Sequence, residues 1–569
     1  MLKKPVYVLG TGLSHNASSV LLKDGKICVG IEKERLTRVK HDGGNDNQSI
    51  QYCLDAEGIR LEDVDLVVQT ANFDIPEREY HQGKRLFTSP QHPPIVNISH
   101  HLAHAYSAIG TCPFDECYIM IIDGCGSPFS QYQTLHPDVP GILMGNFSAA
   151  REMICEKDSF YYYDGHKLRT LQKDFSPMSG LQSDQKISLP TTRHSIGGFY
   201  AAVSHYVFNN MDDVGKLMGL APFGKSGVYN HQAFCFKKGR LFIDEDWNKH
   251  LNQPSGGYDH FIQNFDYYAN VAKWAQEQVE YAVLQCIDER FKTHPPGKLC
   301  YSGGVALNAV ANSKLSDKLG HTNLYFEPAA GDNGLALGCA FYGWLEYLKK
   351  PKVKHNGSTC FGKVYGQDHI ENMLVQDMAN TRLSFTRFDT EDELLRICAQ
   401  KLVEGKVMAW FYEGSEFGPR ALGRRSILAH PGIEGLQNHI NRHIKFREDF
   451  RPFAPAVQEE KVHLYFEKGY SSPYMILTDR TRKEFLEALI NVTHKDGSAR
   501  VQTVGKKWSL RFWKLLEEFG KQSGIPVLLN TSLNKKGMPM VETPEEAFSF
   551  FKESALDLLI IENQMIEKK

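Results

Sequence analysis

The chain has 569 residues, of which 42% are hydrophobic, and its 65 Lys and Arg residues nearly balance 67 Asp and Glu residues. One hydrophobic core seldom serves a chain of this length, so we expect at least two domains. The net charge of -2 lacks the basic excess of a dedicated nucleic-acid-binding protein. No segment approaches the roughly 20 apolar residues of a membrane span. The start of the chain lacks the apolar core of a signal peptide, so we expect a cytoplasmic protein without membrane contact.

The first segments predict a duplicated α/β unit. "VYVLG" and "SSVLLKDGKICVGIEKERL" read as three short strands, with Asp24 and Gly25 in the turn of a hairpin. A similar start recurs where the apolar strand "CYIMIID" ends in the loop "DGCG" and another strand follows. Later, "YYANVAKWAQEQVEYAVLQCIDERFKTH" has helical periodicity and leads into a strand, the glycine loop "SGGVALN" and a new helix.

A domain boundary is expected in the polar segment 349–362, where Pro, Gly, Asn and Lys interrupt the pattern. We therefore divide the chain into domains 1–355 and 356–569. In the second, "KVMAWFYEG", "RPFAPAV", "IPVLLNTSL" and "ALDLLIIEN" read as strands, and "TPEEAFSFFKES" as a helix. Both domains are thus expected to be α/β. The 12 cysteines are spread without a CxxC spacing, which predicts reduced thiols and no disulfide framework.

Three histidines in "NISHHLAHAYSA" raise the question of a metal site. A short helix from Ser99 would put His100 and His104 on one face, one turn apart, with His101 pointing away. Asp123 ends a strand and Asp332 precedes a helix, which are positions that face clefts in α/β folds. Two imidazoles and two carboxylates suit iron(II), manganese or zinc. A pair of ordinary polar histidines is the alternative.

Glycine turns at predicted element ends favour an ATP cradle shared between two halves, because glycine amides meet an anion without side-chain obstruction. No Walker A loop or kinase signature is present in the sequence, so ordinary phosphoryl transfer is unsupported. The candidate nucleotide-binding residues are Gly126, Gly197, Gly198, Ser302, Gly303, Gly304, Asn308 and Gly331.

A basic set gathers in "FGPRALGRRS" and "NRHIKFREDFRPFAP". One interpretation is an exposed face with salt bridges to Glu448 and Asp449. The other is a pocket in which converging guanidinium groups hold a small phosphate dianion, since Gly and Pro favour turns over one smooth helix. Arg500 and the polar "NTS" that follows an apolar strand would complete that pocket.

These motifs, in this order, resemble the O-carbamoyltransferases of antibiotic tailoring and nodulation-factor decoration, the NodU/CmcH group. The pieces that carry the resemblance span nearly the whole chain: "EKERLTRVKHDG", "HHLAHA", "GKLMGLAPFG", "SGGVALN", "PAAGDNGLALG", "FGPRALGRRSIL", "FREDFRPFAPAV" and "LLNTSLN". The resemblance implies an N-terminal actin- and Hsp70-like ATPase domain, similar to the tRNA threonylcarbamoylation transferase, and a C-terminal YrdC-like domain.

The implied reaction uses ATP, with Mg, and carbamoyl phosphate to make carbamoyl-adenylate, and then passes the carbamoyl group to a hydroxyl of a natural product or sugar. By this resemblance His100, His104, Asp123 and Asp332 hold an iron(II)-type ion. His15 is the candidate general base, with a turn-stabilising role as the alternative. Lys40 meets phosphate or the carbamoyl oxygen, unless it is a solvated lysine. The resemblance assigns the carbamoyl phosphate contacts to Arg420, Lys445, Arg451, Arg500 and Asn530.

Two other functions stay open at this point. A tRNA-modifying carbamoyltransferase would keep the chemistry and change the acceptor, but the near-neutral charge disfavours it. A non-catalytic actin-like nucleotide-binding module that regulates a partner would leave the basic set without a purpose. The sequence names neither the acceptor hydroxyl nor the metal, and the oligomeric state is open, a homodimer included. The acceptor-binding loops are expected within 147–189 or 229–260.

Overall fold

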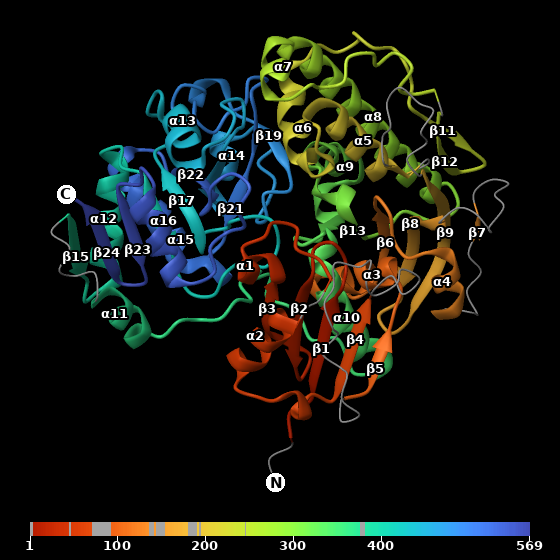
Figure 1. The fold of residues 1–569 in the computed structure, drawn as a ribbon, viewed down its shortest axis with the longest axis horizontal. Helices are drawn as coiled ribbons and strands as arrows, with labels where there is room; N and C mark the ends of the chain where they lie inside the picture. Colours follow the sequence, from red (N-terminus) through yellow and green to blue (C-terminus); the bar gives the residue numbers. More distant parts are fainter. Residues whose placement is uncertain are drawn as a thin grey trace. The chain divides into compact units, whose positions relative to one another are not determined.

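The computed structural model describes residues 4–44, 47–70, 93–135, 142–143, 154–179, 191–192, 195–244, 246–375 and 382–569. Part of the predicted acceptor loop 147–189, namely 147–153 and 180–189, lies outside the described residues. The chain forms two compact units (Figure 1), the first with Met1–Cys28 and Gly43–His355, and the second with Val29–Asp42 and Asn356–Lys569. Among the described helices, none has the length and apolar character needed to cross a bilayer.

The first sheet of the first unit has the strand order β3-β2-β1-β4-β5. β1 (Tyr7–Gly12) runs antiparallel to β2 (Ser18–Lys23) and parallel to β4 (Leu66–Thr70), which is parallel to β5 (Ile95–Asn97). β3 (Lys26–Glu32) follows the turn at Asp24 and Gly25, whose φ angles of 50° and 78° are those of a tight hairpin turn. The predicted hairpin is therefore confirmed.

The second sheet repeats this arrangement around β6. β6 (Cys117–Ile122) runs antiparallel to β8 (Ile154–Tyr163) and parallel to β13 (Leu299–Ser302). β8 is antiparallel to β9 (Leu168–Ser179), and β13 is parallel to β14 (Leu324–Phe326). β7 (Ile142–Leu143) and β10 (Thr191–Thr192) pair with β9. The repeated strand arrangement of the two sheets confirms the duplicated α/β halves.

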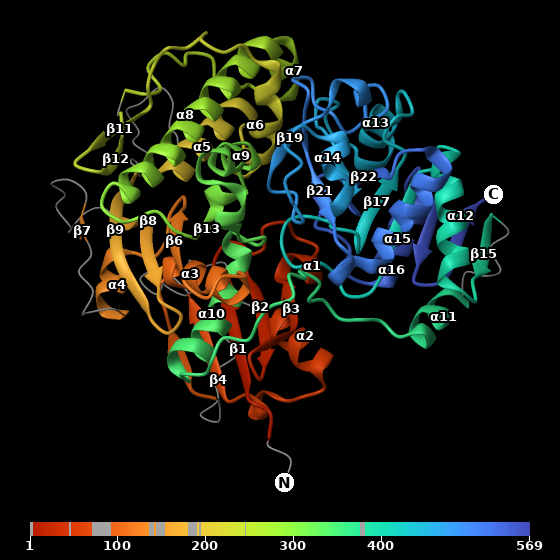
Figure 2. The same ribbon diagram turned by 180° about the vertical axis from the view of Figure 1, so that it is seen from behind.

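Helices of the first unit pack against these sheets. α8 (Phe265–Phe291) buries the predicted stripe, including Val271, Trp274 and Ile287, and packs against α5, α6 and α9. Figures 1 and 2 show these helices grouped at one end of the second sheet. The helices and the small hairpin are α2 (Asn47–Glu57), α3 (His100–Thr111), α4 (Phe129–Leu135), α5 (Ile196–Phe208), α6 (Val214–Leu220), α7 (Tyr258–Gln263), α9 (Ala309–Leu319), α10 (Leu335–Tyr342), β11 (Phe234–Lys237) and β12 (Arg240–Ile243).

The second unit is built on an eight-stranded mixed sheet in the order β15-β24-β23-β16-β17-β22-β18-β21. Its strands are β15 (Leu383–Arg387), β16 (Met408–Phe411), β17 (Arg425–Ala429), β18 (Ala454–Gln458), β21 (Gln502–Val504), β22 (Val527–Ser532), β23 (Leu558–Ile561) and β24 (Gln564–Lys568). A separate pair joins β19 (Thr478–Arg480) to β20 (Ser498–Arg500). The helices are α1 (Lys33–Thr37), α11 (Gln367–Val375), α12 (Glu391–Val403), α13 (Leu436–His439), α14 (Val462–Tyr465), α15 (Lys506–Ser523) and α16 (Pro544–Glu553).

Strand alternation explains how this sheet is buried on both faces. In β16, Met408 and Trp410 join one hydrophobic core, and Ala409 and Phe411 join another, because successive side chains point to opposite faces. α12 and α15 cover the first face, and α11 and α16 cover the second. The second unit is therefore α/β, as predicted. Its likeness to a YrdC-like domain stays a prediction.

The segment Val29–Asp42 belongs to the second unit, although the sequence suggested that all of 1–355 forms one domain. The side chain of Arg35 donates to the carbonyl of Gly418 at 2.7 Å, and Arg38 donates to the carbonyls of Pro539 and Met540 at 2.9 and 2.6 Å. The amide of Gly418 in turn donates to Glu32. Hydrogen bonds between residues distant in sequence leave no signal in the composition. The sequence therefore did not reveal that Val29–Asp42 belongs to the second unit.

Candidate functional site

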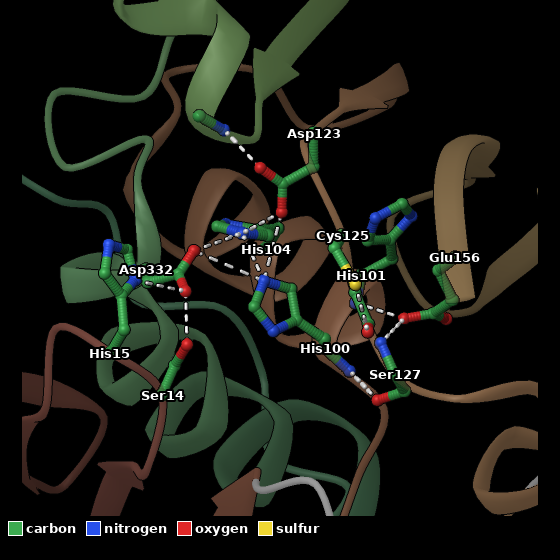
Figure 3. A network of polar contacts seen from close by, with 12 residues as sticks. Ser14, His15, His100, His101, His104, Asp123, Cys125, Ser127, Glu156 and Asp332 are labelled. Atoms are coloured by element: carbon green, nitrogen blue, oxygen red, sulfur yellow. Dashed lines mark hydrogen bonds and ion pairs between the residues drawn. The ribbon is translucent and has the colours of Figure 1, made fainter. Parts of the chain in front are cut away.

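α3 puts His100 and His104 side by side. The helix begins at His100, immediately after Ser99, and its i and i+4 imidazoles lie with their Nε2 atoms 3.2 Å apart. His101 points away from this pair (Figure 3). Its Nδ1 contacts the hydroxyl of Ser159 at 2.8 Å. Both features are those expected from the spacing.

Two carboxylates from other elements meet the histidines. Asp123 follows the last residue of β6, and Asp332 begins the short turn before α10. α10 packs closely on α3 because Gly338 has no Cβ, which would lie 1.7 Å from the carbonyl of Ala103. This close approach of the two helices brings Asp332 beside the imidazoles.

The four ligand-type atoms converge on one point. His100 Nε2 lies 3.1 Å from Asp123 Oδ2 and 3.4 Å from Asp332 Oδ1, and His104 Nε2 lies 3.6 and 3.9 Å from the same oxygens. All four atoms lie within 4.8 Å of one another. Metal–ligand bonds of about 2.1 Å in a tetrahedron put ligand atoms about 3.4 Å apart. The donor set and its spacing therefore fit a divalent ion of the type that accepts nitrogen and oxygen ligands.

In each carboxylate, one oxygen faces the histidines and the other oxygen has a separate hydrogen-bond partner. That second contact orients the oxygen that faces the histidines. Asp123 Oδ1 accepts a hydrogen bond from the amide of Gly304 at 3.0 Å. Asp332 Oδ2 accepts one from the hydroxyl of Ser14, and His15 Nδ1 lies 3.3 Å from it (Figure 3). Such outer contacts fix the direction of metal-ligating groups. Ser14 was missed by the sequence reasoning, although it precedes His15.

The charges of the cluster stabilise one another. Burial alone would lower the pKa of His100, but the carboxylates of Asp332 and Asp123 raise it well above its ordinary value. Burial would raise the pKa of Asp123 and of Asp332, yet the neighbouring histidines hold both below the usual range. Two carboxylates thus stay ionised in a buried place, where a cation is favoured.

A buried network beside this cluster fixes the start of α3. The carboxylate of Glu156 accepts hydrogen bonds from the amides of His101 and Ser127 at 3.1 and 3.0 Å, and pairs with the ammonium of Lys173. The hydroxyl of Ser127 accepts from the amide of His100 at 2.9 Å. Burial lowers the pKa of His101 to about 3, so this imidazole stays neutral. Through its contact with Ser159, this imidazole belongs to the network that supports the start of α3.

The predicted nucleotide residues are only partly brought together. Gly303 and Gly304 lie against the end of β6, and Gly197 packs on Gly124. The hydroxyl of Ser195, just before Gly197 and Gly198, donates to the carbonyl of Asp123. Gly331 immediately precedes Asp332, and Ser302 ends β13 with its side chain buried. These positions surround the carboxylate of Asp123.

Two of the predicted nucleotide residues have structural contacts. A Cβ on Gly126 would lie 2.7 Å from the carboxylate of Glu156, so this glycine permits close packing inside the network beside α3. Asn308 caps α9 by accepting from the amide of Ala311, and it also exchanges hydrogen bonds with Gln276.

Cationic side chains converge in the second unit. Burial lowers the pKa of Arg500 far below its ordinary value, and nearby Arg420, Arg447 and Arg451 lower it further. Burial and the charge of Arg451 likewise lower the pKa of Arg420 to about 10. We call the following residues the arginine cluster: Arg420, Lys445, Arg447, Arg451 and Arg500. Mutual repulsion of this kind is relieved when an anion binds.

Polar partners of Lys445 come from the end of β22 and the loop that follows it. Lys445 Nζ donates to the carbonyl of Ser532 at 2.6 Å and to Asn534 Oδ1 at 2.5 Å. Its pKa is lowered by burial, then by Arg447, Arg451 and Lys40. Lys40 belongs to the second unit and acts electrostatically on Lys445. The amide nitrogen of Asn530 donates to Gln502, whereas its Oδ1 is buried and accepts no hydrogen bond from the described residues.

Two other members of the basic set have structural contacts, and Arg442 is the one that fits the interpretation of an exposed face with salt bridges. Arg442 is exposed and pairs with Asp449 at 2.5 Å. Arg425 is fully buried, donates to the carbonyls of Tyr412 and Glu413, and stacks on Phe411. Arg447, by contrast, belongs to the arginine cluster although it was not among the predicted contacts. Sequence spacing alone does not separate these three arginines.

The fold and the site define an α/β protein with a duplicated first unit, a His–Asp cluster beside glycine turns, and a cluster of cationic side chains in the second unit. A family model described as the N-terminus of carbamoyltransferases matches residues 8–84 and 77–341, and one described as the C-terminus matches 399–568. The chain belongs to the carbamoyltransferase family and is a transferase enzyme. The predicted resemblance is confirmed.

Named relatives are similar over most of their length. Nodulation protein NolNO of Sinorhizobium fredii is 28% identical, with 98% of this chain and 79% of the relative covered. The 3'-hydroxymethylcephem-O-carbamoyltransferase of Amycolatopsis lactamdurans is 30% identical, with 77% and 74% covered. Among solved structures, HypF of T. kodakarensis has a TM-score of 0.38 and 16% identity, covering 61% of this chain and 49% of HypF.

Proposed function

We propose that this enzyme uses ATP and carbamoyl phosphate to form carbamoyl-adenylate, and transfers the carbamoyl group to a hydroxyl of a small molecule. Relatives that are named for nodulation and for a hydroxymethylcephem make a saccharide or a natural product the expected acceptor class. The net charge of -2 argues against a nucleic-acid acceptor.

The arginine cluster is the observation that carries this proposal. Its members depress one another's pKa, which is the electrostatic signature of a place built for a compact anion. Carbamoyl phosphate brings a dianionic phosphate for the guanidinium groups and a carbamoyl amide for the open Oδ1 of Asn530. A charge-assisted hydrogen bond of this type contributes about 1.5–3 kcal/mol.

The proposed chemistry balances in three steps. Water cleaves carbamoyl phosphate to carbamate and phosphate. A carbamate oxygen then attacks the α-phosphorus of ATP, forming carbamoyl-adenylate and releasing pyrophosphate. Finally, the acceptor hydroxyl attacks the carbamoyl carbon, so that a C–O bond forms, the bond to AMP breaks, and AMP leaves. The glycine turns close to Asp123, at Gly197 and Gly303, are the proposed place of the nucleotide, because glycine lets backbone amides meet an anion without side-chain obstruction.

His100, His104, Asp123 and Asp332 would hold the metal ion, which we propose is iron(II), with manganese and zinc as the other ions that suit this donor set. A bound divalent ion supplies Lewis acidity and favours developing negative charge. His15 is the proposed general base for the acceptor hydroxyl. Although burial lowers its pKa, the hydrogen bond and charge of Asp332 raise the pKa above its ordinary value, so the imidazole retains an abstracted proton.

Mass spectrometry on a panel of candidate alcohols tests this function. The purified enzyme is given ATP, Mg, iron(II) and carbamoyl phosphate with amino sugars, macrolides, oligosaccharides or hydroxymethyl compounds. We expect one class to gain a single carbamoyl group, and Arg451→Met to lose that product. Arg442→Met is the matched control, because Arg442 is exposed and paired with Asp449. Carbamoylation of tRNA in place of every small alcohol would overturn the acceptor class.

A further inference from the structure

Three buried cysteines meet in the first unit, away from the His–Asp cluster. Cys112 caps the end of α3, Cys117 begins β6, and Cys300 lies in β13. Their exposed fractions are 2%, 1% and 0%. The sulfur atoms of Cys117 and Cys300 are 3.6 Å apart, and all three sulfurs lie within 4.8 Å of one another. Isolated buried cysteines behave as small apolar side chains, but three sulfurs in mutual contact form a set of soft ligands.

A lysine supplies the charge that such a set of thiolates needs. Lys352 Nζ lies 3.4 Å from the sulfur of Cys112 and also donates to the carbonyls of Cys112 and Phe114 at 3.0 and 2.7 Å. Three thiolates, one divalent cation and one ammonium group sum to zero net charge. Neutrality matters because an uncompensated charge is costly in a buried place.

We propose that Cys112, Cys117 and Cys300 bind a thiophilic metal ion, with zinc as the occupant. Zinc–sulfur bonds of about 2.3 Å put sulfur ligands about 3.8 Å apart in a tetrahedron, close to the 3.6 Å between Cys117 and Cys300. On binding, three S–H protons are released to solvent and three sulfur–metal bonds form, without any change of oxidation state. Copper(I) shares this ligand chemistry, and the experiment separates the two ions.

The position of this thiol site suggests what it does. α3 spans 12 residues, or about 18 Å, with His100 at its first residue and Cys112 just after its last. β6 likewise starts at Cys117 and is followed by Asp123, and β13 carries Cys300 shortly before Gly304. A metal at the thiol site would fasten the far ends of the three elements that present His100, Asp123 and the amide of Gly304. The thiol site is thus a structural metal site, and its role does not depend on the proposed carbamoyl chemistry.

Cobalt substitution tests the thiol site on the full chain. The protein is purified under reducing conditions, stripped of metal and titrated with cobalt(II), which gives a thiolate charge-transfer band only when bound to sulfur. We expect the band in the wild type and in the His100→Ala/His104→Ala variant, and at least a fivefold weaker band in Cys112→Ser. Cys286→Ser, a buried cysteine on α8 outside the site, should keep it.

Metal analysis of the untreated wild type serves where a cysteine variant does not fold. We expect about one equivalent of zinc with sulfur neighbours in its X-ray absorption spectrum. One equivalent of copper with sulfur neighbours would overturn zinc as the occupant. A wild type that holds no sulfur-bound metal and gives no cobalt band would overturn the site altogether, as would a band of full strength in a folded Cys112→Ser variant.

Discussion

Replacing Arg420 by methionine should make the anion-free enzyme more stable and remove its response to phosphate. Arg420 lies in the arginine cluster, where its Nε has no acceptor among the described residues and Arg451 repels it. Methionine keeps much of the apolar stem and carries no charge. The wild type, in contrast, should be stabilised by a phosphate anion that all the cationic side chains attract.

The size of the effect follows from the shifted pKa. The pKa of Arg420 falls from 12.5 to about 10, first because of burial and then because of Arg451. At about 1.4 kcal/mol per pKa unit, the charged side chain destabilises the folded state by up to about 3 kcal/mol. The guanidinium stays protonated at neutral pH, so this destabilisation is fully present there. The Tm of a folding unit of this size changes by about 2–4 °C for each kcal/mol of stability. Removing the charge of Arg420 should therefore raise the Tm by up to roughly 10 °C.

Thermal unfolding followed by calorimetry, with and without inorganic phosphate, measures both effects. Arg442→Met is the control, since this exposed arginine pairs with Asp449 and should change neither the Tm nor the phosphate response. If Arg420→Met lowers the Tm without phosphate, and phosphate still raises the Tm of that variant as much as that of the wild type, the reasoning about a mutually repelling anion site is refuted.

Three further changes test the fold and the metal cluster. Gly338→Ala should cost about 1–3 kcal/mol of unfolding free energy in chemical denaturation, because its Cβ would strike the carbonyl of Ala103, whereas Gly215→Ala meets open space and should cost nothing. Burial raises the pKa of Glu327 from 4.5 to about 7. Between these two pH values the carboxyl group is protonated in the folded state but ionised in the unfolded state, so folding binds a proton. Stability should therefore fall by up to about 3 kcal/mol as the pH rises from 4.5 through 7, and Glu327→Gln should abolish that slope; an unchanged slope would contradict the assignment. His104→Ala should remove the iron(II) equivalent measured by elemental analysis, and undiminished iron would show that the ion binds elsewhere.

Local spacing made much of the His–Asp cluster predictable. The i and i+4 spacing of His100 and His104 sets both imidazoles on one helical face, whatever surrounds the helix. Asp123 follows a strand that is apolar throughout, so its place at the strand end was readable as well. The contacts that orient the carboxylates, from Ser14 and the amide of Gly304, depend on how distant segments pack and had no local signal.

Long-range packing also decided where sequence reasoning fell short. Lys40 lies with the second unit because Arg35 and Arg38 anchor its segment there. The thiol site joins Cys117 to Cys300 across 183 positions, so no spacing rule could have found it.

Phosphorus NMR on ATP with carbamoyl phosphate, without any acceptor, tests the proposed activation most directly. We expect pyrophosphate and carbamoyl-adenylate, with AMP where water hydrolyses that intermediate, to form only when carbamoyl phosphate is present. Arg451→Met should abolish these products, while Arg442→Met forms them. ADP as the product, or pyrophosphate release that does not depend on carbamoyl phosphate, would contradict carbamoyl-adenylate as the intermediate.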